Sequence, residues 1–226
     1  MENIFVCTLM CVLSLMSSLS QNSIYLDGQS CSTQIVVSGT SIYSHSGFNQ
    51  RLAFSKNIEC TIRLVSKFKN GHINLMVKSF HLPQNFENID NQCHSVLYIF
   101  NFNKKKDDGT NGYCGKKIFE NYLSIGPNMT LYFKTQRNTV GGYGFHIIAT
   151  AVYQNKYCAD NFQCRSSQYC IDKDLICDGT KHCFDESDES TIMLCKELLK
   201  INEGLKIAKN TQKTSKVNFS SPPSIC

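Results

Sequence analysis

The sequence of 226 residues contains no tryptophan and only four prolines, and only 18% of its side chains are charged. With 13 glycines and 42% hydrophobic residues, its composition excludes collagen and a largely disordered chain. Lysine and arginine (23) exceed aspartate and glutamate (18) by five, a smaller excess than nucleic-acid-binding proteins usually carry in one patch. We therefore predict one or two globular domains and no nucleic-acid partner.

The sequence also lacks the local motifs of common catalytic sites. Its six histidines never form a His-Glu-x-x-His pattern, and no serine lies in Gly-x-Ser-x-Gly. Catalysis needs a nucleophile beside a base, or an open metal position, in a cleft. We predict a protein that is not an enzyme.

Long apolar segments are missing after the first twenty residues. Ile4 to Met16 is an apolar run of 13 residues, too short to span a bilayer, and small residues at Ser18 and Ser20 precede Gln21. This pattern is typical of a secretory signal peptide, so we predict a signal peptide at residues 1–20, a secreted extracellular protein and no membrane span in this chain.

Cysteine, in contrast, is abundant, with 13 residues in the whole sequence. Cysteines at this density persist as disulfides only in an oxidising compartment, which agrees with secretion. Of the 11 that follow the signal peptide, four are spread over residues 31–114, six are crowded into residues 158–195, and one ends the sequence. The six crowded cysteines allow 15 connectivities, which their spacing alone does not distinguish.

The region with few cysteines has the pattern of β-strands. Apolar side chains alternate in Ile73, Leu75 and Val77, which is the period of half-buried strands. Other short segments are rich in β-branched and aromatic residues: 34–37, 60–65, 96–102, 129–133 and 145–152. Frequent short strands separated by glycine and asparagine predict an all-β antiparallel sandwich.

Charge divides the chain in the same way. Residues 31–153 carry 13 basic and 6 acidic side chains, or +7; residues 158–195 carry 3 and 8, or −5; residues 196–226 carry 6 and 2, or +4. The middle segment is too short and too polar to build a large core, so disulfides must hold it together.

Five carboxylates lie within 12 residues of this segment, between Asp178 and Glu189. Calcium binds carboxylates and backbone carbonyls through six to eight oxygens with loose geometry, and it would neutralise this charge. The alternatives are a solvated acidic loop and a knot held by disulfides alone.

The segments Phe162-Gln163-Cys164, Cys170-Ile171, Cys177-Asp178-Gly179 and Ser187-Asp188-Glu189 carry a specific resemblance. Set among six cysteines, they resemble the low-density lipoprotein receptor class A module, over residues 157–196. The resemblance implies three disulfides: Cys158–Cys170, Cys164–Cys183 and Cys177–Cys195. It also implies one calcium ion, held by the side chains of Asp178, Asp188 and Glu189 and by the carbonyls of Leu175 and Thr180.

Two residues depart from the family pattern. Leu175 stands where the family usually has tryptophan, an aromatic that often helps to grip a partner's lysine. His182 stands where the family has an acidic calcium ligand, and imidazole is a poor ligand for a cation that prefers oxygen. We therefore expect calcium affinity to be weakened to roughly the 10⁻⁴ to 10⁻³ M of weak extracellular sites. Asp185 and Glu186 are expected to remain available for a basic partner.

The larger block resembles a CUB domain, over residues 31–153. The resemblance rests on the spacing of its cysteines, on Gly112-Tyr113-Cys114-Gly115 and on Gly141-Gly142-Tyr143-Gly144-Phe145. It implies the disulfides Cys31–Cys60 and Cys93–Cys114. The acidic residues with which many CUB domains bind calcium are replaced here, with Pro83, His94-Ser95-Val96 and Gln136 at the matching places. We expect no calcium site in this block.

Three further features are candidate contact or modification sites. Lys104, Lys105 and Lys106 lie in a polar loop and are able to meet sulfated glycans or an acidic protein, although such runs are usually solvated. Asn128 and Asn218 each begin an N-glycosylation sequon. Residues 197–226 are predicted to be a basic tail, partly disordered, in which Cys226 either forms a disulfide-linked dimer, ends a truncated product or is a capped thiol.

These predictions combine into one leading hypothesis for function. The chain is expected to be a secreted, non-catalytic protein of two modules, whose acidic module uses calcium-organised carboxylates to bind basic side chains of an extracellular protein ligand. The alternatives are the ectodomain of a single-pass receptor or co-receptor, the non-catalytic part of a secreted protease, and a matrix protein.

Overall fold

The computed structural model describes residues 23–83, 93–101, 112–116, 121–137, 141–190 and 195. Several predictions fall outside these residues: the signal peptide, the lysines 104–106, the sequon at Asn218, the basic tail and Cys226. The chain divides into two compact units, Met1–Tyr153 and Gln154–Cys226, which are described separately here.

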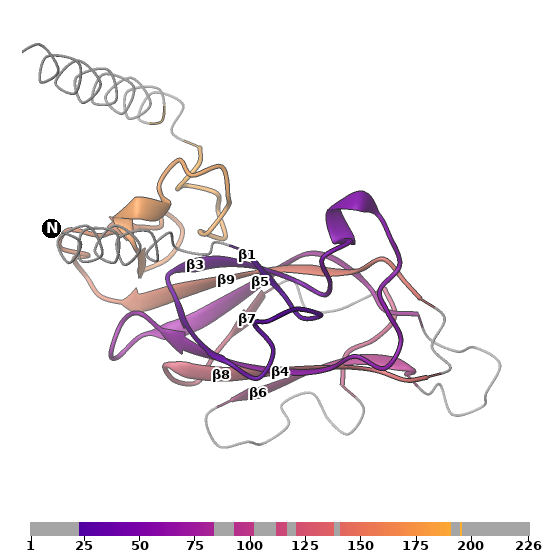
Figure 1. Cartoon of the computed structure of the whole chain (residues 1–226). Coiled ribbons are helices and arrows are strands. Elements are labelled where there is room, and N and C mark those ends of the chain that lie inside the picture. The colour runs from indigo at the N-terminus through magenta and orange to yellow at the C-terminus, as the bar shows by residue number, and fades with distance from the viewer. Residues whose placement is uncertain are drawn as a thin grey trace, which may run out of the picture. The chain divides into compact units, whose positions relative to one another are not determined.

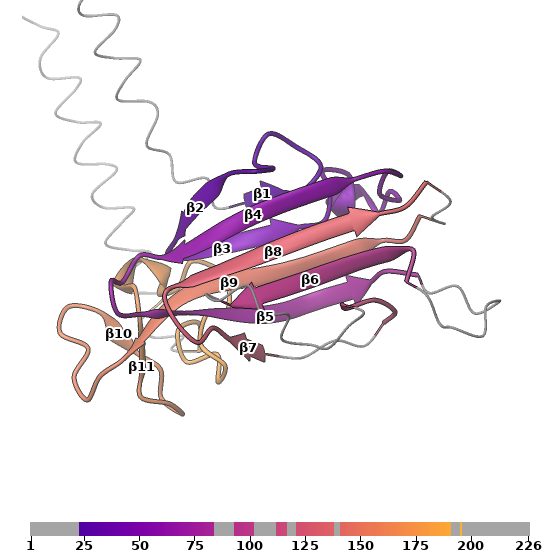
Figure 2. The same cartoon turned by 90° about the horizontal axis from the view of Figure 1, so that it is seen from below.

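The first unit contains two β-sheets (Figure 1). One sheet has four strands, in the order β2 (Gln34–Val37), β4 (Glu59–Ser66), β8 (Asn128–Thr135) and β6 (Ser95–Asn101). The central strands of this sheet run side by side in Figure 2. The burial of β4 alternates strictly over most of its length, so that one face points into the protein and the other toward solvent.

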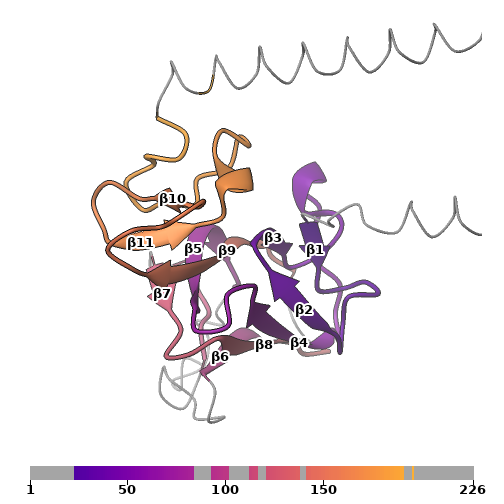
Figure 3. The ribbon, with the colours of Figure 1, turned by 90° about the vertical axis from the view of Figure 1, so that its left-hand side faces the viewer.

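The other sheet of this unit is built around two long strands. Its order is β1 (Ser23–Tyr25), β3 (Gly39–Tyr43), β9 (Gly144–Gln154), β5 (His72–His81) and β7 (Asn121–Leu123). Figure 3, which looks along the strands, shows the two sheets as separate layers. A 3₁₀ helix, η1 (Phe48–Gln50), follows β3.

Consecutive strands of the unit alternate between the two sheets along the chain, from β1 to β9. Among the described pairings of this unit, β1 pairs with β3 and β2 with β4 in parallel, whereas the others are antiparallel. The predicted fold class, an all-β sandwich followed by a small disulfide-rich module, is confirmed.

The core lies between the two sheets. Phe133 of β8 and Phe145 of β9 are fully buried, and their ring centroids are 5.2 Å apart in an edge-to-face arrangement that joins the sheets. Such a pair contributes about 0.5–1.5 kcal/mol beyond the burial of its area. Phe54 packs edge-on against Phe133, with 5.9 Å between ring centroids. Phenylalanine thus supplies the large aromatic side chains of this core, in a sequence that has no tryptophan.

The second unit has little regular structure. It contains a short antiparallel hairpin, β10 (Phe162–Gln163) and β11 (Tyr169–Ile171), and a 3₁₀ helix, η2 (Lys173–Leu175). Disulfides take the place of a large core in this unit. The structure joins Cys158–Cys170, Cys164–Cys183 and Cys177–Cys195 here, and Cys31–Cys60 and Cys93–Cys114 in the sandwich. These are the pairs that the two resemblances imply.

Candidate functional site

Asp188 is the organising residue of the acidic loop. Its carboxylate is completely buried and accepts hydrogen bonds from the backbone N–H groups of His182 (2.6 Å) and Cys183 (3.2 Å). The carbonyl of Asp188 accepts a further bond from the N–H of Cys177 (3.2 Å). A buried charge is tolerated only with such partners, so Asp188 fixes the path of the loop between two disulfides.

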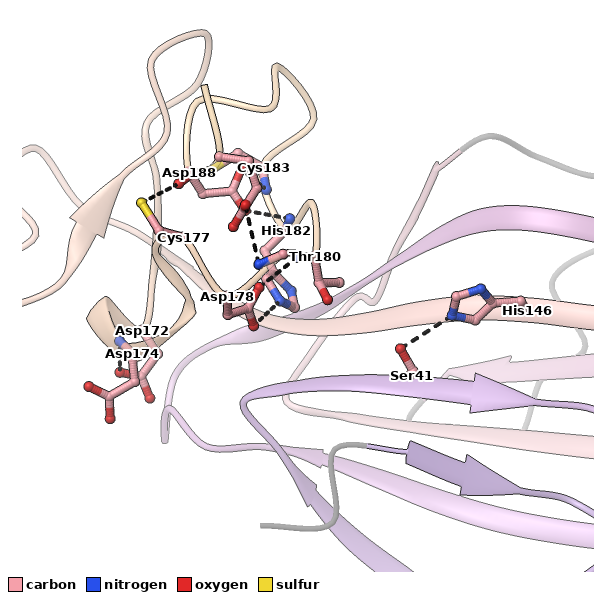
Figure 4. A network of polar contacts seen from close by, with 12 residues as sticks. Ser41, His146, Asp172, Asp174, Cys177, Asp178, Thr180, His182, Cys183 and Asp188 are labelled. Carbon is pink, nitrogen blue, oxygen red and sulfur yellow. Dashed lines mark hydrogen bonds and ion pairs between the residues drawn. The ribbon is translucent and has the colours of Figure 1, made fainter. Parts of the chain in front are cut away.

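Asp178 and His182 meet beside it (Figure 4). One carboxylate oxygen of Asp178 accepts the N–H of Thr180 at 2.8 Å, and the other lies 3.2 Å from Nε2 of His182. His182 is only 2% exposed, so its ring is part of the interior of the module. A side chain able to carry positive charge therefore lies against one of the predicted calcium ligands.

Glu189 has a carboxylate with one satisfied and one unsatisfied oxygen. Its Oε2 accepts the N–H of Gly179 at 3.2 Å, but its Oε1 is buried without a hydrogen-bond partner among the described residues. Burial, together with the nearby charges of Asp178 and Asp188, raises the pKa of Glu189. Glu189 is therefore close enough to Asp178 and Asp188 to be repelled by them, and a cation at Oε1 would relieve both the repulsion and the unsatisfied oxygen.

The donor atoms are of the type that calcium prefers, but their positions do not form a coordination shell around a single point. Carboxylate oxygens are the ligands that calcium prefers, and Oε1 of Glu189 has no hydrogen-bond partner within the described part of the chain. Leu175, which ends η2, and Thr180 lie in the same module, as the predicted carbonyl ligands. Among the described residues, however, no group of three or more His, Cys, Asp or Glu side chains is arranged to hold a metal.

The structure corrects the expectation for Asp185. Its carboxylate accepts hydrogen bonds from the N–H groups of Ser166 and Ser187. Burial acts to raise the pKa of Asp185, but these hydrogen bonds outweigh it and lower the pKa. Asp185 therefore holds the loop together and is not a free contact residue as expected.

Glu186 and Phe184 form the exposed side of the same loop. Glu186 makes an ion pair with Lys181, so its carboxylate already has a lysine partner within the module. Phe184 is 66% exposed, whereas Leu175, at the family's tryptophan position, is buried. The sequence reasoning missed Phe184, because a single aromatic in an acidic loop does not show by pattern whether it is buried or exposed.

In the sandwich, two of the residues at the positions that we expected to lack calcium ligands contact each other. Nδ1 of His94 lies 3.1 Å from Oε1 of Gln136. Asn128, the sequon residue, begins β8 opposite Val65 of β4 and is half-buried.

The second unit, with its three disulfides and its acidic loop, matches a known protein family. Residues 156–195 match the family described as low-density lipoprotein receptor domain class A. This segment therefore has the sequence pattern of a class A module. Its presence confirms the recognition made from the sequence, and modules of this kind are disulfide-rich, extracellular and typically non-catalytic.

The sandwich is similar to CUB domains in solved structures. It matches the CUB1-EGF-CUB2 domain of human MASP-1/3 at 16% identity and a TM-score of 0.43, over 54% of this chain and 42% of that chain. The MASP-1 CUB2 domain bound to Ca²⁺ gives 15% identity and a TM-score of 0.44, over 53% of this chain and 98% of that chain. The full extracellular region of zebrafish Gpr126/Adgrg6 gives 16% identity and a TM-score of 0.42, over 59% and 17%.

No curated protein matches the chain. None of the helices in the part of the chain that the structure describes has the length and hydrophobicity to span a bilayer.

Proposed function

We propose that this protein is a secreted, non-catalytic binding protein whose class A module uses calcium-organised carboxylates to bind basic side chains of an extracellular protein. The observation that carries the proposal is the buried, unpartnered Oε1 of Glu189 beside Asp178 and Asp188. An uncompensated carboxylate oxygen in a disulfide-fixed loop is costly unless a cation satisfies it.

The contact surface in this proposal is the exposed side of the loop. Glu186 supplies the charge and Phe184 an exposed apolar ring, which can pack against the methylene groups of a lysine. The ion pair between Glu186 and Lys181 is the same kind of contact that a lysine of the partner protein would make with Glu186. Calcium would act indirectly, by fixing the loop that carries these two residues.

Binding of the oxidised full-length chain to an immobilised tetralysine peptide tests the proposal. We expect binding in 5 mM calcium that falls at least about fivefold in EGTA. Glu186→Gln should weaken it by about 1.4-fold to fivefold, since exposed charge pairs contribute about 0.2–1 kcal/mol. Asp160→Asn, which removes an exposed charge elsewhere in the module, is the matched control. Equal binding in calcium and EGTA, or equal losses in both variants, would contradict the proposal.

A further inference from the structure

The sandwich contains a pocket that the class A module does not explain. Its volume is about 540 Å³, within the usual range of ligand sites. The lining residues that matter chemically are four rings, one cation and one hydroxyl: Phe48, Phe80, His81, Tyr143, Arg51 and Ser79.

The floor of the pocket is apolar. Phe80, on β5, is 8% exposed and stacks on the core residue Phe145, with 5.8 Å between ring centroids. The register of β5 against β9 shifts between Val77 and Ser79, and such an irregularity changes the direction of the following side chains. Phe80 therefore belongs to the core on one side and to the pocket on the other.

One wall is formed by Tyr143 and His81. Tyr143 is 60% exposed, and its ring centroid lies 5.6 Å from that of His81. The chain beside it is closely packed, because a Cβ at Gly142 would lie within 2.7 Å of the carbonyl oxygen of His81. Tyrosine has only two side-chain torsions, so an exposed tyrosine loses little conformational entropy in a contact.

The rim of the pocket carries positive charge. Arg51 is exposed, follows η1 and has a left-handed φ of 57°, which is uncommon for arginine. The described residues that line the pocket include no acidic side chain, and no ion pair of Arg51 is found among the described residues. The N–H of Tyr143 points to Nδ1 of His81 at 3.4 Å, so the neutral ring carries its proton on Nε2 and can donate it.

We propose that this pocket binds an aromatic side chain flanked by carboxylates, in an acidic segment of a partner protein. The four rings accept a flat apolar group, as edge or face partners. The guanidinium of Arg51 pairs with a carboxylate, which it can bind through two hydrogen bonds. The sandwich and the class A module would then recognise groups of opposite charge.

Three blocked tripeptides test this site on the ¹⁵N-labelled full-length chain by NMR titration at low salt. The acetylated amides of Asp-Tyr-Asp, Lys-Tyr-Lys and Asp-Ala-Asp separate the need for the ring from the need for the charge. We expect shifts at Tyr143, His81 and Arg51 with Asp-Tyr-Asp, and at least about fivefold weaker binding of the other two peptides.

Variants of the protein complete the test. Arg51→Asn removes the cation and keeps a residue that tolerates a left-handed φ, while Tyr143→Ala removes the exposed ring. Each should weaken Asp-Tyr-Asp binding at least about fivefold without changing the melting temperature. Arg63→Gln, on β4 of the other sheet, is the control and should leave the affinity for Asp-Tyr-Asp unchanged. The proposal is overturned if the three peptides bind equally, if Arg51→Asn has no effect, or if a sulfated disaccharide displaces Asp-Tyr-Asp at lower concentration.

Discussion

Nε2 of His182 lies 3.2 Å from Oδ2 of Asp178, inside the acidic loop of the class A module. The family resemblance implies an acidic calcium ligand at position 182, where this chain has a histidine. The loop nevertheless keeps the buried carboxylate of Asp188 and the unsatisfied oxygen of Glu189. The acidic loop therefore retains the carboxylates that the resemblance implies at Asp188 and Glu189, but has a different residue type at position 182.

Asp188→Ala should prevent correct oxidative folding of the class A module. The carboxylate accepts two buried backbone N–H bonds, from His182 and Cys183, and hydrogen bonds to a charged group contribute about 1.5–3 kcal/mol each. Refolding in a glutathione buffer, followed by peptide mapping, should show scrambled pairs in place of Cys164–Cys183 and Cys177–Cys195. Asp188→Asn, which keeps one acceptor oxygen, should be affected less. Native pairing in Asp188→Ala would contradict this role.

Lys181→Ala should increase the affinity of the chain for a lysine-rich peptide. The substitution releases Glu186 from its internal ion pair, so the gain should be about twofold to fivefold, which corresponds to the energy of an exposed pair. Immobilised-peptide binding measures this gain. Lys173→Ala, in η2 of the same module, removes the same charge and should produce a smaller gain. Equal gains would mean that only net charge matters.

Gly144→Ala should destabilise the sandwich by about 2–4 kcal/mol, since Gly144 has a φ of 78° and an added Cβ would overlap the side chain of Ser44. Urea unfolding followed by circular dichroism measures the loss. Gly126→Ala is the matched control, because nothing lies within 4 Å of a Cβ at that position. A similar midpoint in the two variants would show that the strand accommodates the methyl group.

His146 should make the sandwich less stable in mild acid. Its burial, and to a lesser extent Lys78, lower its pKa from 6.5 to about 4, so the unfolded chain binds a proton that the folded protein excludes. Stability from this group is complete above about pH 6.5 and falls as the pH drops toward 4. The variant His146→Phe keeps a ring against Tyr43. Between pH 7 and pH 4.5, its melting temperature should fall by about 2–4 °C less than that of the native protein. An identical fall in both proteins would exclude His146 as the source.

Alternation and turn residues were enough to predict β2, β4, β5, β6, β8 and β9, but not β1, β3 or β7. β3 begins Gly39-Thr40-Ser41, a composition that resembles a turn, although Thr40 and Ile42 are buried in the sheet. β7 has no buried residue and therefore no pattern to detect. Both strands depend on pairing with distant residues, which local sequence does not encode.

The acidic loop was predicted only in part, because its contacts also join residues that are distant in the sequence. Residue types and spacing identified its carboxylates, but not which of them the fold uses internally. Asp185 accepts a hydrogen bond from the N–H of Ser166, 19 residues away, and local sequence does not encode a contact over that separation. The pocket at Tyr143 was also beyond the sequence, since it joins residues of η1, β5 and the loop before β9.

Calcium titration of the oxidised full-length chain by calorimetry, with His182→Asp beside the native protein, tests the central claim most directly. The predicted result is weak binding of one calcium ion by the native chain, in the range of about 10⁻⁴ to 10⁻³ M, and about tenfold tighter binding by the variant, which regains a carboxylate ligand. No heat of binding from the native chain, with clear binding by His182→Asp, would contradict a working calcium site. The disulfides and Asp188 alone would then hold the module.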